Sequence, residues 1–311
     1  MADSSSERVA ETKRHSLLVS FLIRLVKEKP LGTAGAVITL LLLAAGIFAD
    51  FIAPYGMNEI NAGPLLLAPS TQFWLGTDNI GRDLLSRIIF GARISVIVGL
   101  AAATIATILS VLIGILCGYI GGIFDLVVQR LVDAWMCFPG LILMMVLISI
   151  IGAGMWQVII VLGLLYGIAG SRIIRGATIS TRENVYIAAA TAIGCSTARI
   201  LTRHILPNVM APTIILFTTR VPNVILTEAA LSFLGFGIPP PYPSWGNMLS
   251  ESGREYMFIA PWLCIWPGLT LTLVVYGVNM FGDAVRDLVD PRLRGGAGRY
   301  GIRAKQKEKR K

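Results

Sequence analysis

Charged residues are scarce in this chain. Asp, Glu, Lys and Arg make up 14% of its 311 residues, whereas apolar residues make up 55%. A soluble domain usually carries about 25% charged residues. The chain therefore has too few charges for a surface that faces water on all sides, and the composition indicates a protein that is largely surrounded by lipid.

Motifs for catalysis, nucleotide binding and metal binding are also missing. The two histidines, His15 and His204, have no neighbouring ligand types, and the four cysteines form no C-x-x-C pair. A metal site is therefore not expected. No G-x-x-x-x-G-K-[ST] occurs that would cradle ATP phosphates, and no G-x-S-x-G or H-E-x-x-H suggests hydrolysis. We expect neither an enzyme nor a cofactor bound by this chain.

Long uncharged runs are what the chain has in place of these motifs. A helix that crosses a bilayer needs about 20 apolar residues. The run 134–171 is too long for one crossing, and Gly152-Ala153-Gly154 is a turn signal that divides it. We predict an all-α membrane protein with six transmembrane helices, at about 30–49, 94–117, 134–151, 156–173, 209–234 and 261–282. Two small-residue pairs, Gly114/Gly118 and Gly163/Gly167, permit close helix packing.

The distribution of Lys and Arg predicts the orientation. With the N-terminus inside, 22 of the 27 cationic side chains lie on inner segments and four on outer segments. Cytoplasmic loops carry an excess of Lys and Arg, so both termini are expected in the cytoplasm. The predicted organisation is a tail with an interfacial helix (1–30), a six-span domain (31–283) and a basic tail near lipid (284–311). The six-span domain has outer loops at 54–93 and 235–260 and a cytoplasmic loop at 174–208.

The segment before the first span has an apolar side and three cationic residues, Arg24, Lys27 and Lys29. This pattern in residues 16–29 favours a helix that lies in the inner membrane interface. A simple extension of the first span is the alternative.

The loop between spans four and five contains signals for two short helices. Ser180-Thr181-Arg182-Glu183 is a capping box that predicts a helix start at Ser180. Gly194 is expected to end that helix, Ser196 to cap a second one, and Pro207 to stop it. Small residues near the corner would let another surface approach closely. A connector without a partner is the alternative, and a DNA-binding pair of helices is excluded because two membrane spans hold both ends.

Two charged residues, Arg220 and Glu228, interrupt the fifth span. A charge inside a span is costly and tends to face the bundle interior or water. Both are candidates for a translocation path. They do not stack on an ideal helix, although a kink at Pro222 would change this, and Glu228 is close enough to the outer end to reach water instead.

The loop resembles the one shared by membrane subunits of bacterial ABC importers. The match consists of Ala188-Ala189-Ala190, Gly194 and His204-Ile205-Leu206-Pro207. The family carries Glu where this chain has Ala188. The resemblance implies that an ATPase subunit docks here, by shape and apolar contact around Ile187, Ala189 and Ile193 rather than through that carboxylate. The implied coupling residues are Tyr186, Ile187, Ala188, Ala189, Ala190, Gly194, Ile205, Leu206 and Pro207.

Further segments resemble the second permease subunit of dipeptide, oligopeptide and nickel importers. They are Leu75-Gly76-Thr77-Asp78-Asn79-Ile80-Gly81-Arg82-Asp83-Leu84-Leu85-Ser86-Arg87, Phe138-Pro139-Gly140, Leu231-Ser232-Phe233-Leu234-Gly235-Phe236-Gly237, Ser244-Trp245-Gly246 and Gly282-Asp283-x-x-Arg286-Asp287-x-x-Asp290-Pro291. Within them, Thr77 or Asp78 is a candidate cap for the helix entering span two. The residues Asp283, Arg286, Asp287 and Asp290 are spaced for pairing along a helix.

The resemblance implies a type I ABC importer permease in the bacterial inner membrane, which forms half of a pathway for peptides or, as the alternative, for nickel or another small solute. The implied partners are a homologous second permease, two cytoplasmic ATPases that hold ATP and Mg, an extracytoplasmic binding protein and membrane lipid, without nucleic acid. A membrane-embedded enzyme would need clustered polar residues within the spans. An ion-coupled carrier would show inverted repeats, which the sequence does not suggest.

Overall fold

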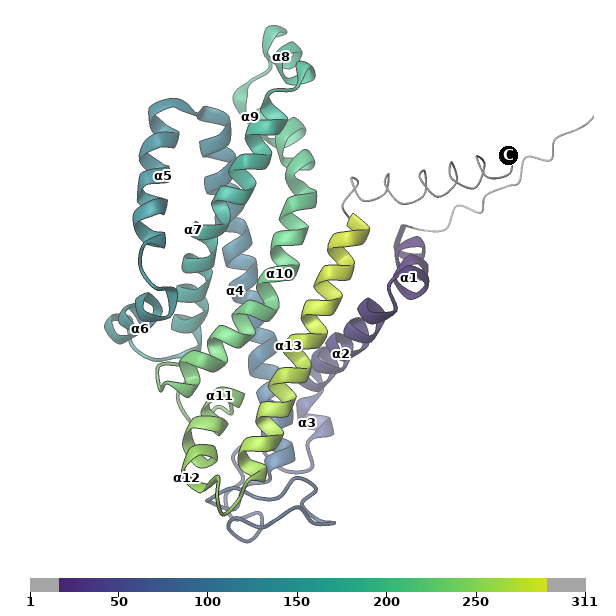
Figure 1. Ribbon diagram of the computed structural model, residues 1–311, viewed down its shortest axis with the longest axis vertical. Helices are drawn as coiled ribbons and strands as arrows, with labels where there is room; N and C mark the ends of the chain where they lie inside the picture. The colour runs from purple at the N-terminus through teal and green to yellow at the C-terminus, as the bar shows by residue number, and fades with distance from the viewer. Residues whose placement is uncertain (1–16, 290–311) are drawn as a thin grey trace, which may run out of the picture.

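The computed structural model of this protein describes residues 17–289, and helices form its regular secondary structure (Figure 1). The long helices are α2 (Pro30–Ile47), α4 (Leu84–Ile120), α5 (Gly122–Met136), α7 (Met155–Arg182), α10 (Leu206–Phe233) and α13 (Trp262–Val289). The shorter ones are α1 (Leu17–Glu28), α3 (Ala49–Ile52), α6 (Gly140–Ile151), α8 (Val185–Ala192), α9 (Thr197–Ile200), α11 (Trp245–Met248) and α12 (Arg254–Tyr256), with π-helical turns η1 (Leu201–Ile205) and η2 (Leu249–Gly253).

The long helices fit a membrane-spanning bundle. Within the described residues, five stretches are long and apolar enough to cross a bilayer, and a sixth is obtained if the bent pair α5 and α6 is one span. This confirms the predicted all-α membrane fold. The turn predicted at Gly152-Ala153-Gly154 is also confirmed, because α6 ends at Ile151 and α7 begins at Met155.

The prediction for the third span is wrong in its boundaries. The helix begins at Gly122 rather than near Ala134, and α5 and α6 meet at an angle of 91°. Pro139 stands at the bend, where it offers no backbone N–H and disfavours a helical Phe138. The uncharged run from Ala134 to Ile151 is therefore not one continuous helix. The helix starts earlier, within a charged stretch of α5 that a search for uncharged runs leaves out.

The closest helix pairing in the bundle is between α4 and α7. A Cβ added at Gly114 would lie 2.7 Å from both the Ile174 Cβ and the Ser171 carbonyl oxygen. At the other end of the same contact, a Cβ added at Gly167 would lie 2.9 Å from the Leu109 Cβ. Glycine therefore allows the two backbones to approach, as the spacings Gly114/Gly118 and Gly163/Gly167 predicted.

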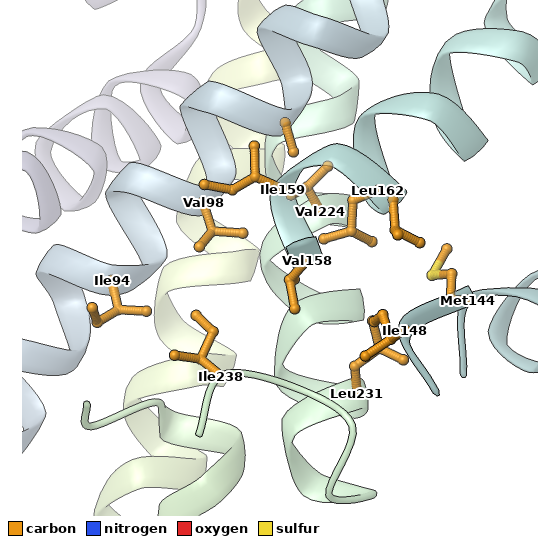
Figure 2. Close-up of a cluster of buried hydrophobic side chains, with 12 residues drawn as sticks. Ile94, Val98, Met144, Ile148, Val158, Ile159, Leu162, Val224, Leu231 and Ile238 are labelled. Atoms are coloured by element: carbon orange, nitrogen blue, oxygen red, sulfur yellow. The ribbon is translucent and has the colours of Figure 1, made fainter. Parts of the chain in front are cut away.

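A buried apolar cluster joins this pair to α10 and to the bent segment. Figure 2 shows side chains from α4, α6, α7 and α10 pointing toward one another, with Ile238 closing the cluster from the loop after α10. Its members are Ile94, Val98, Ala102, Met144, Ile148, Val158, Ile159, Val161, Leu162, Val224, Leu231 and Ile238. This cluster fixes α10, which carries both intramembrane charges of interest, against α4 and α7.

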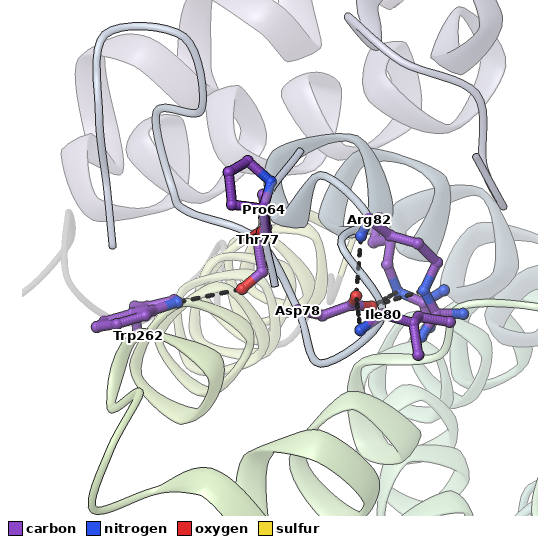
Figure 3. A network of polar contacts seen from close by, with 7 residues as sticks. Pro64, Thr77, Asp78, Ile80, Arg82 and Trp262 are labelled. Carbon is purple, nitrogen blue, oxygen red and sulfur yellow. Dashed lines mark hydrogen bonds and ion pairs between the residues drawn. The ribbon is translucent and has the colours of Figure 1, made fainter. Parts of the chain in front are cut away.

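The segment before α4 is folded by buried polar contacts. The Asp78 carboxylate accepts from the backbone N–H groups of Ile80 and Arg82 at 3.0 and 2.9 Å, and from the Arg82 Nε at 2.6 Å. In Figure 3 the Trp262 indole points at the Thr77 carbonyl, which accepts from it at 3.4 Å. The segment 75–87 is therefore a structural element that fastens the loop before α4 to the start of α13.

The cap of α4 differs from the predicted one. Neither Thr77 nor Asp78 takes that position, because their side chains are used within the loop. Asp83 is the N-cap, and its carboxylate accepts from the Ser86 N–H at 2.8 Å. A cap satisfies one of the free N–H groups at a helix start, so α4 begins ten residues before the predicted span at Ile94.

A buried carboxylate holds the end of α10 to the following loop. Glu228 is 1% exposed. Its Oε1 accepts from the Ser232 and Ser244 hydroxyls, both at 2.7 Å. Next to Ser244, the Trp245 indole donates to the Ile88 carbonyl of α4 at 3.1 Å. The segments 231–237 and 244–246, which resemble those of the importer permeases, therefore meet at this carboxylate. Glu228 does not reach water.

Among the described residues at the end of α13, Asp283, Arg286 and Asp287 form no ion pair with one another, and pairing with Asp290 stays a prediction. Asp287 pairs with Lys29, at the junction of α1 and α2, with the Nζ 2.5 Å from the Oδ2. The contact joins two distant parts of the sequence rather than neighbouring turns of one helix. Asp290 and Pro291 lie outside the described residues, as do Ser16 and the basic tail.

We expect Gly114→Leu to destabilise the bundle, because a side chain there must displace the backbone of α7. The expected loss is at least about 1–3 kcal/mol, the usual cost of overpacking a filled core. The measurement is thermal unfolding of the purified complex in detergent. Gly176→Leu is the matched control on α7, since a Cβ there meets no atom within 4 Å. Equal melting temperatures for the two variants would contradict the close packing.

We expect Glu228→Leu to destabilise the protein by about 1–3 kcal/mol, since it leaves two buried hydroxyl groups without their acceptor. Glu228→Gln keeps an acceptor oxygen of the same reach and is expected to retain most of the stability. Limited proteolysis of the loop 235–244, together with thermal unfolding, checks both variants. The role of the carboxylate as a structural fastener is refuted if Glu228→Gln is as damaging as Glu228→Leu.

Candidate functional site

A helical projection stands at one end of the bundle, beyond the ends of α4, α7 and α10 (Figure 1). It contains α8 and α9 and is called here the α8–α9 projection (185–200). The predicted helix start at Ser180 is wrong. The Glu183 N–H donates to the Ile179 carbonyl, so the helical ladder of α7 runs through the capping-box sequence, and α8 begins only after Asn184.

Gly194 ends α8, as predicted. Its φ of +80° lies in the left-handed region that favours glycine. The Gly194 N–H donates to the Thr191 carbonyl and the Cys195 N–H to the Ala190 carbonyl. This pair of bonds is the Schellman arrangement, and it satisfies the last carbonyls of α8 while turning the chain toward α9.

The second half of the projection continues into the membrane span. Pro207 was predicted to stop the helix, but α9, η1 and α10 follow one another without a break, and the run Thr197–Phe233 qualifies as one span. Pro207 has no N–H for the carbonyl one turn earlier and would crowd it. The wider π-helical turn at Leu201–Ile205 lies in that turn, which explains how the helix accommodates the proline.

The exposed surface of α8 and of the turn that follows it, up to Gly194, consists mostly of small and apolar residues. Val185 is 84% exposed and Ile193 is 81% exposed. Ala188 and Ala189 are exposed between them. A Cβ on Gly194 would meet no atom within 4 Å, so the tip of the projection is open to an approaching surface.

Other residues of the predicted site face inward. Ile187 is 3% exposed and faces inward in the single chain, so its predicted contact with a partner stays a prediction. It packs with Ala190 and Ile205 in a cluster that also holds Ile115 of α4 and Ile174 of α7. The centre of the Tyr186 ring on α8 lies 6.3 Å from that of the His204 ring on η1. Leu206 is half-buried beside this cluster, and Pro207 is exposed.

Ion pairs between α5 and α7 were missed at the level of sequence. The Arg175 guanidinium donates to both oxygens of Asp125, with its Nε 2.6 Å from the Oδ1. Asp133 accepts from Arg172 of α7 and pairs with Arg130 of α5. These groups line a cleft of about 510 Å³ between the two helices. A helical spacing of acids in 125–133 was the available signal.

The structure does not bring Arg220 and Glu228 together. The Arg220 Cζ lies 5.0 Å from the centre of the Tyr166 ring on α7, whereas Glu228 binds the two serines. Arg220 is half-buried, and its Nε is buried without a hydrogen-bond partner in the described residues. The kink considered at Pro222 therefore does not pair the two charges.

The described residues hold no cluster of three or more His, Cys, Asp or Glu side chains that would bind a metal ion. What the geometry offers is a rigid apolar projection at one end and a cation within the membrane span. These features suit docking and passage of a solute rather than a bond-making reaction.

Comparison with known proteins gives a consistent result. Residues 110–295 match the family model described as "Binding-protein-dependent transport system inner membrane component". The chain is 38% identical over 269 residues to the dipeptide transport system permease protein DppC of Alkalihalophilus pseudofirmus, covering 86% of this chain and 88% of the relative. It is 37% identical over 262 residues to the glutathione transport system permease protein GsiD of Pectobacterium atrosepticum, covering 84% and 87%.

A putative peptide transport system permease protein of Brucella suis is 38% identical over 260 residues, which cover 84% of this chain and 87% of the relative. The family match extends from the middle of α4 to beyond the end of α13 and includes the α8–α9 projection. The chain therefore belongs to the binding-protein-dependent transport system inner membrane components, as a multi-pass permease of the bacterial inner membrane and not an enzyme.

Proposed function

We propose that this chain forms half of the membrane pathway of an ATP-driven importer of peptides. The family membership supports the permease role. The names of three relatives, for dipeptide, glutathione and peptide transport, support a peptide rather than nickel or another small solute. A homologous second permease supplies the other half of the pathway. Two ATPase subunits hold ATP and Mg, and an extracytoplasmic binding protein delivers the substrate.

The proposed orientation places the α8–α9 projection in the cytoplasm. Five cationic residues lie between Arg172 and Arg203, and six precede span one. The excess of Lys and Arg on these segments supports an inner location. The termini are then also cytoplasmic, and the loop with Asp78 and the loop with Ser244 face outward, where a binding protein would arrive.

The observation that carries the proposed coupling role is the apolar tip of the projection on a buried base. Ile193 and Ala189 present a surface that is open to solvent, while Ile187 and Ile205 anchor it to α4 and α7. An exposed apolar surface on a rigid base is typical of a docking site. Movement of an attached ATPase would reach α10 through the uninterrupted helix that follows α9.

A polar stripe on α10 supports a pathway role for Arg220. Thr219, Arg220, Asn223 and Thr227 fall within one side of the helix at 100° per residue, and Asn223 is exposed. The outward faces of α2 and α4 carry apolar residues such as Leu40, Leu41, Ile108 and Leu112. Lipid suits those faces, whereas the stripe of α10 suits water or substrate. Glu228 is buried and its Oε1 accepts from two serine hydroxyls, so the proposal rests on Arg220 alone.

We expect a strain that lacks this chain to lose uptake of labelled dipeptides and tripeptides, and the native chain to restore it. Nickel uptake is measured in the same strains under the same energy supply. Peptide uptake that does not depend on the chain, with nickel uptake that does, would replace the proposed substrate while leaving the permease role in place.

We expect Ile193→Glu to weaken attachment of the ATPase subunits about tenfold, which corresponds to the 1.4 kcal/mol typical of an interface anchor. The charge would be buried at the contact, while membrane insertion is unaffected because the side chain is exposed. Co-purification of the ATPase and ATP hydrolysis in the assembled complex are measured together.

Ala188→Glu is the matched control for this surface. It adds the same charge on α8 at the position where the resembling family carries Glu, and it is expected to keep the ATPase attached. Normal attachment in both variants would place the docking surface elsewhere. Loss in both would show that the projection tolerates no charge, so that position 188 also lies under the partner.

A further inference from the structure

Arg220 has the features of a binding group without its ligand. Its guanidinium makes no ion pair with an acid in the described residues, and its buried Nε has no hydrogen-bond partner there. By contrast, Arg172 and Arg175 on α7 both pair with aspartates of α5. Removing an unpaired charge from water is costly, so the cation at position 220 calls for an anion that the described residues do not supply.

The ring of Tyr166 lies next to the guanidinium of Arg220. The Arg220 Cζ lies 5.0 Å from the ring centre, at a distance where the ring face attracts a cation. A cation–π contact does not use the guanidinium N–H groups as donors to an oxygen acceptor. The in-plane N–H groups, which form a fork suited to a carboxylate, are not consumed by such a contact.

The orientation of Tyr166 is itself fixed by α10. The Thr227 hydroxyl donates its proton to the Asn223 carbonyl at 2.7 Å. It has no second proton, so in the 2.7 Å contact with Tyr166 the phenol donates and Thr227 accepts. Thr227 and Arg220 are thus joined through one ring, and the three residues form a preorganised unit from two helices.

Arg220 and Thr227 lie on the polar stripe of α10, and Tyr166 of α7 stands beside them at the edge of the buried apolar cluster. Arg220, Tyr166 and Thr227 are half-buried, and Asn223 beside them is exposed. A group moving along this face of α10 would therefore reach the cation without unfolding the bundle. An unmodified peptide always carries a terminal carboxylate, whatever its side chains, and this is the anion that a general peptide pathway must pass.

We propose that Arg220, positioned by Tyr166 and Thr227, binds the C-terminal carboxylate of a peptide in transit. The inference rests on the proposed function, since it names the substrate group that the pathway recognises. A fixed arginine fork distinguishes a carboxylate from a neutral carboxamide, and it is indifferent to side-chain identity. The site would therefore select for a free C-terminus rather than for a particular sequence.

The test uses the whole transporter in proteoliposomes, with the binding protein and ATP. Import of a labelled tripeptide and of its C-terminal amide is measured, each expressed per loaded binding protein. We expect Arg220→Gln to lower import of the free acid about tenfold, as for loss of one charge-assisted contact, and to leave import of the amide at the native rate. Arg220→Lys keeps the charge and is expected to restore most import of the acid.

Arg93→Gln is the matched control, since it removes an arginine that pairs with Asp50 away from the stripe. An equal fall for the acid and the amide in Arg220→Gln would overturn the proposal and assign Arg220 to assembly or to a partner subunit. Unchanged import of both peptides would overturn it as well. If the native transporter imports neither peptide, the proposed function fails instead, and the two failures are thus distinguishable.

A second measurement does not depend on acceptance of the amide. A tripeptide with a photoreactive C-terminal residue is delivered to transporters whose ATPase subunits cannot hydrolyse ATP, and the cross-linked segment is mapped. We expect labelling on α10 between Thr219 and Thr227 in the native protein and in Arg220→Lys, with at least a severalfold loss in Arg220→Gln. Equal labelling of all three proteins would refute carboxylate binding at this position.

Discussion

The approach of the α4 and α7 backbones is the contact on which the other elements depend. In a bilayer, lipid tails are as apolar as the helices, so helix association relies on close packing rather than on exclusion of water. The glycines at 114, 118, 163 and 167 allow that packing along the length of both helices. The cluster in Figure 2 adds α10 and α6 to this pair. The α8–α9 projection stands on its far end through Ile115 and Ile174.

The charged side chains of the bundle and of its loops differ in whether they have partners. Asp125 and Arg175 neutralise each other and, together with the pair Asp133 and Arg172, hold α5 to α7. Asp78 and Arg82 shape the loop before α4. Glu228 receives two hydroxyl protons and closes the end of α10. Arg220 is arranged differently, on a stripe that solvent reaches in the single chain. Asp125, Asp78 and Glu228 have hydrogen-bond partners, whereas the Nε of Arg220 has none in the described residues. This difference separates the structural charges from the candidate functional one.

The helical type of the spans could be predicted from the sequence because lipid imposes length and apolarity on each span, and their number agrees with six if the bent pair α5 and α6 is one span. Gly194 was also predictable, since only a residue that tolerates a positive φ fits that turn. The cap at Asp83 was not, because three neighbouring polar residues fit a cap equally well until the loop is folded. The start of α5 and the inward side of Ile187 depend on tertiary partners, Arg175 and Ile174, that no local pattern reveals. Under the proposed function, coupling and substrate contacts involve other chains, so the fold of this chain alone does not define them.

The helix that begins in the projection has a mechanical consequence. Because α9, η1 and α10 form one run of 37 residues, the chain has an uninterrupted helical path of about 55 Å, measured along the helix at 1.5 Å per residue, with Pro212 and Pro222 inside it. A stop at Pro207 would have placed a compliant joint between the two ends. With the π-helical turn in its place, force applied at the tip is not absorbed by a loop. Under the proposed function, one uninterrupted helical run joins the projection that docks the ATPase to the polar stripe that meets the substrate. A displacement of the projection therefore reaches the stripe through the helix itself and not through a loop.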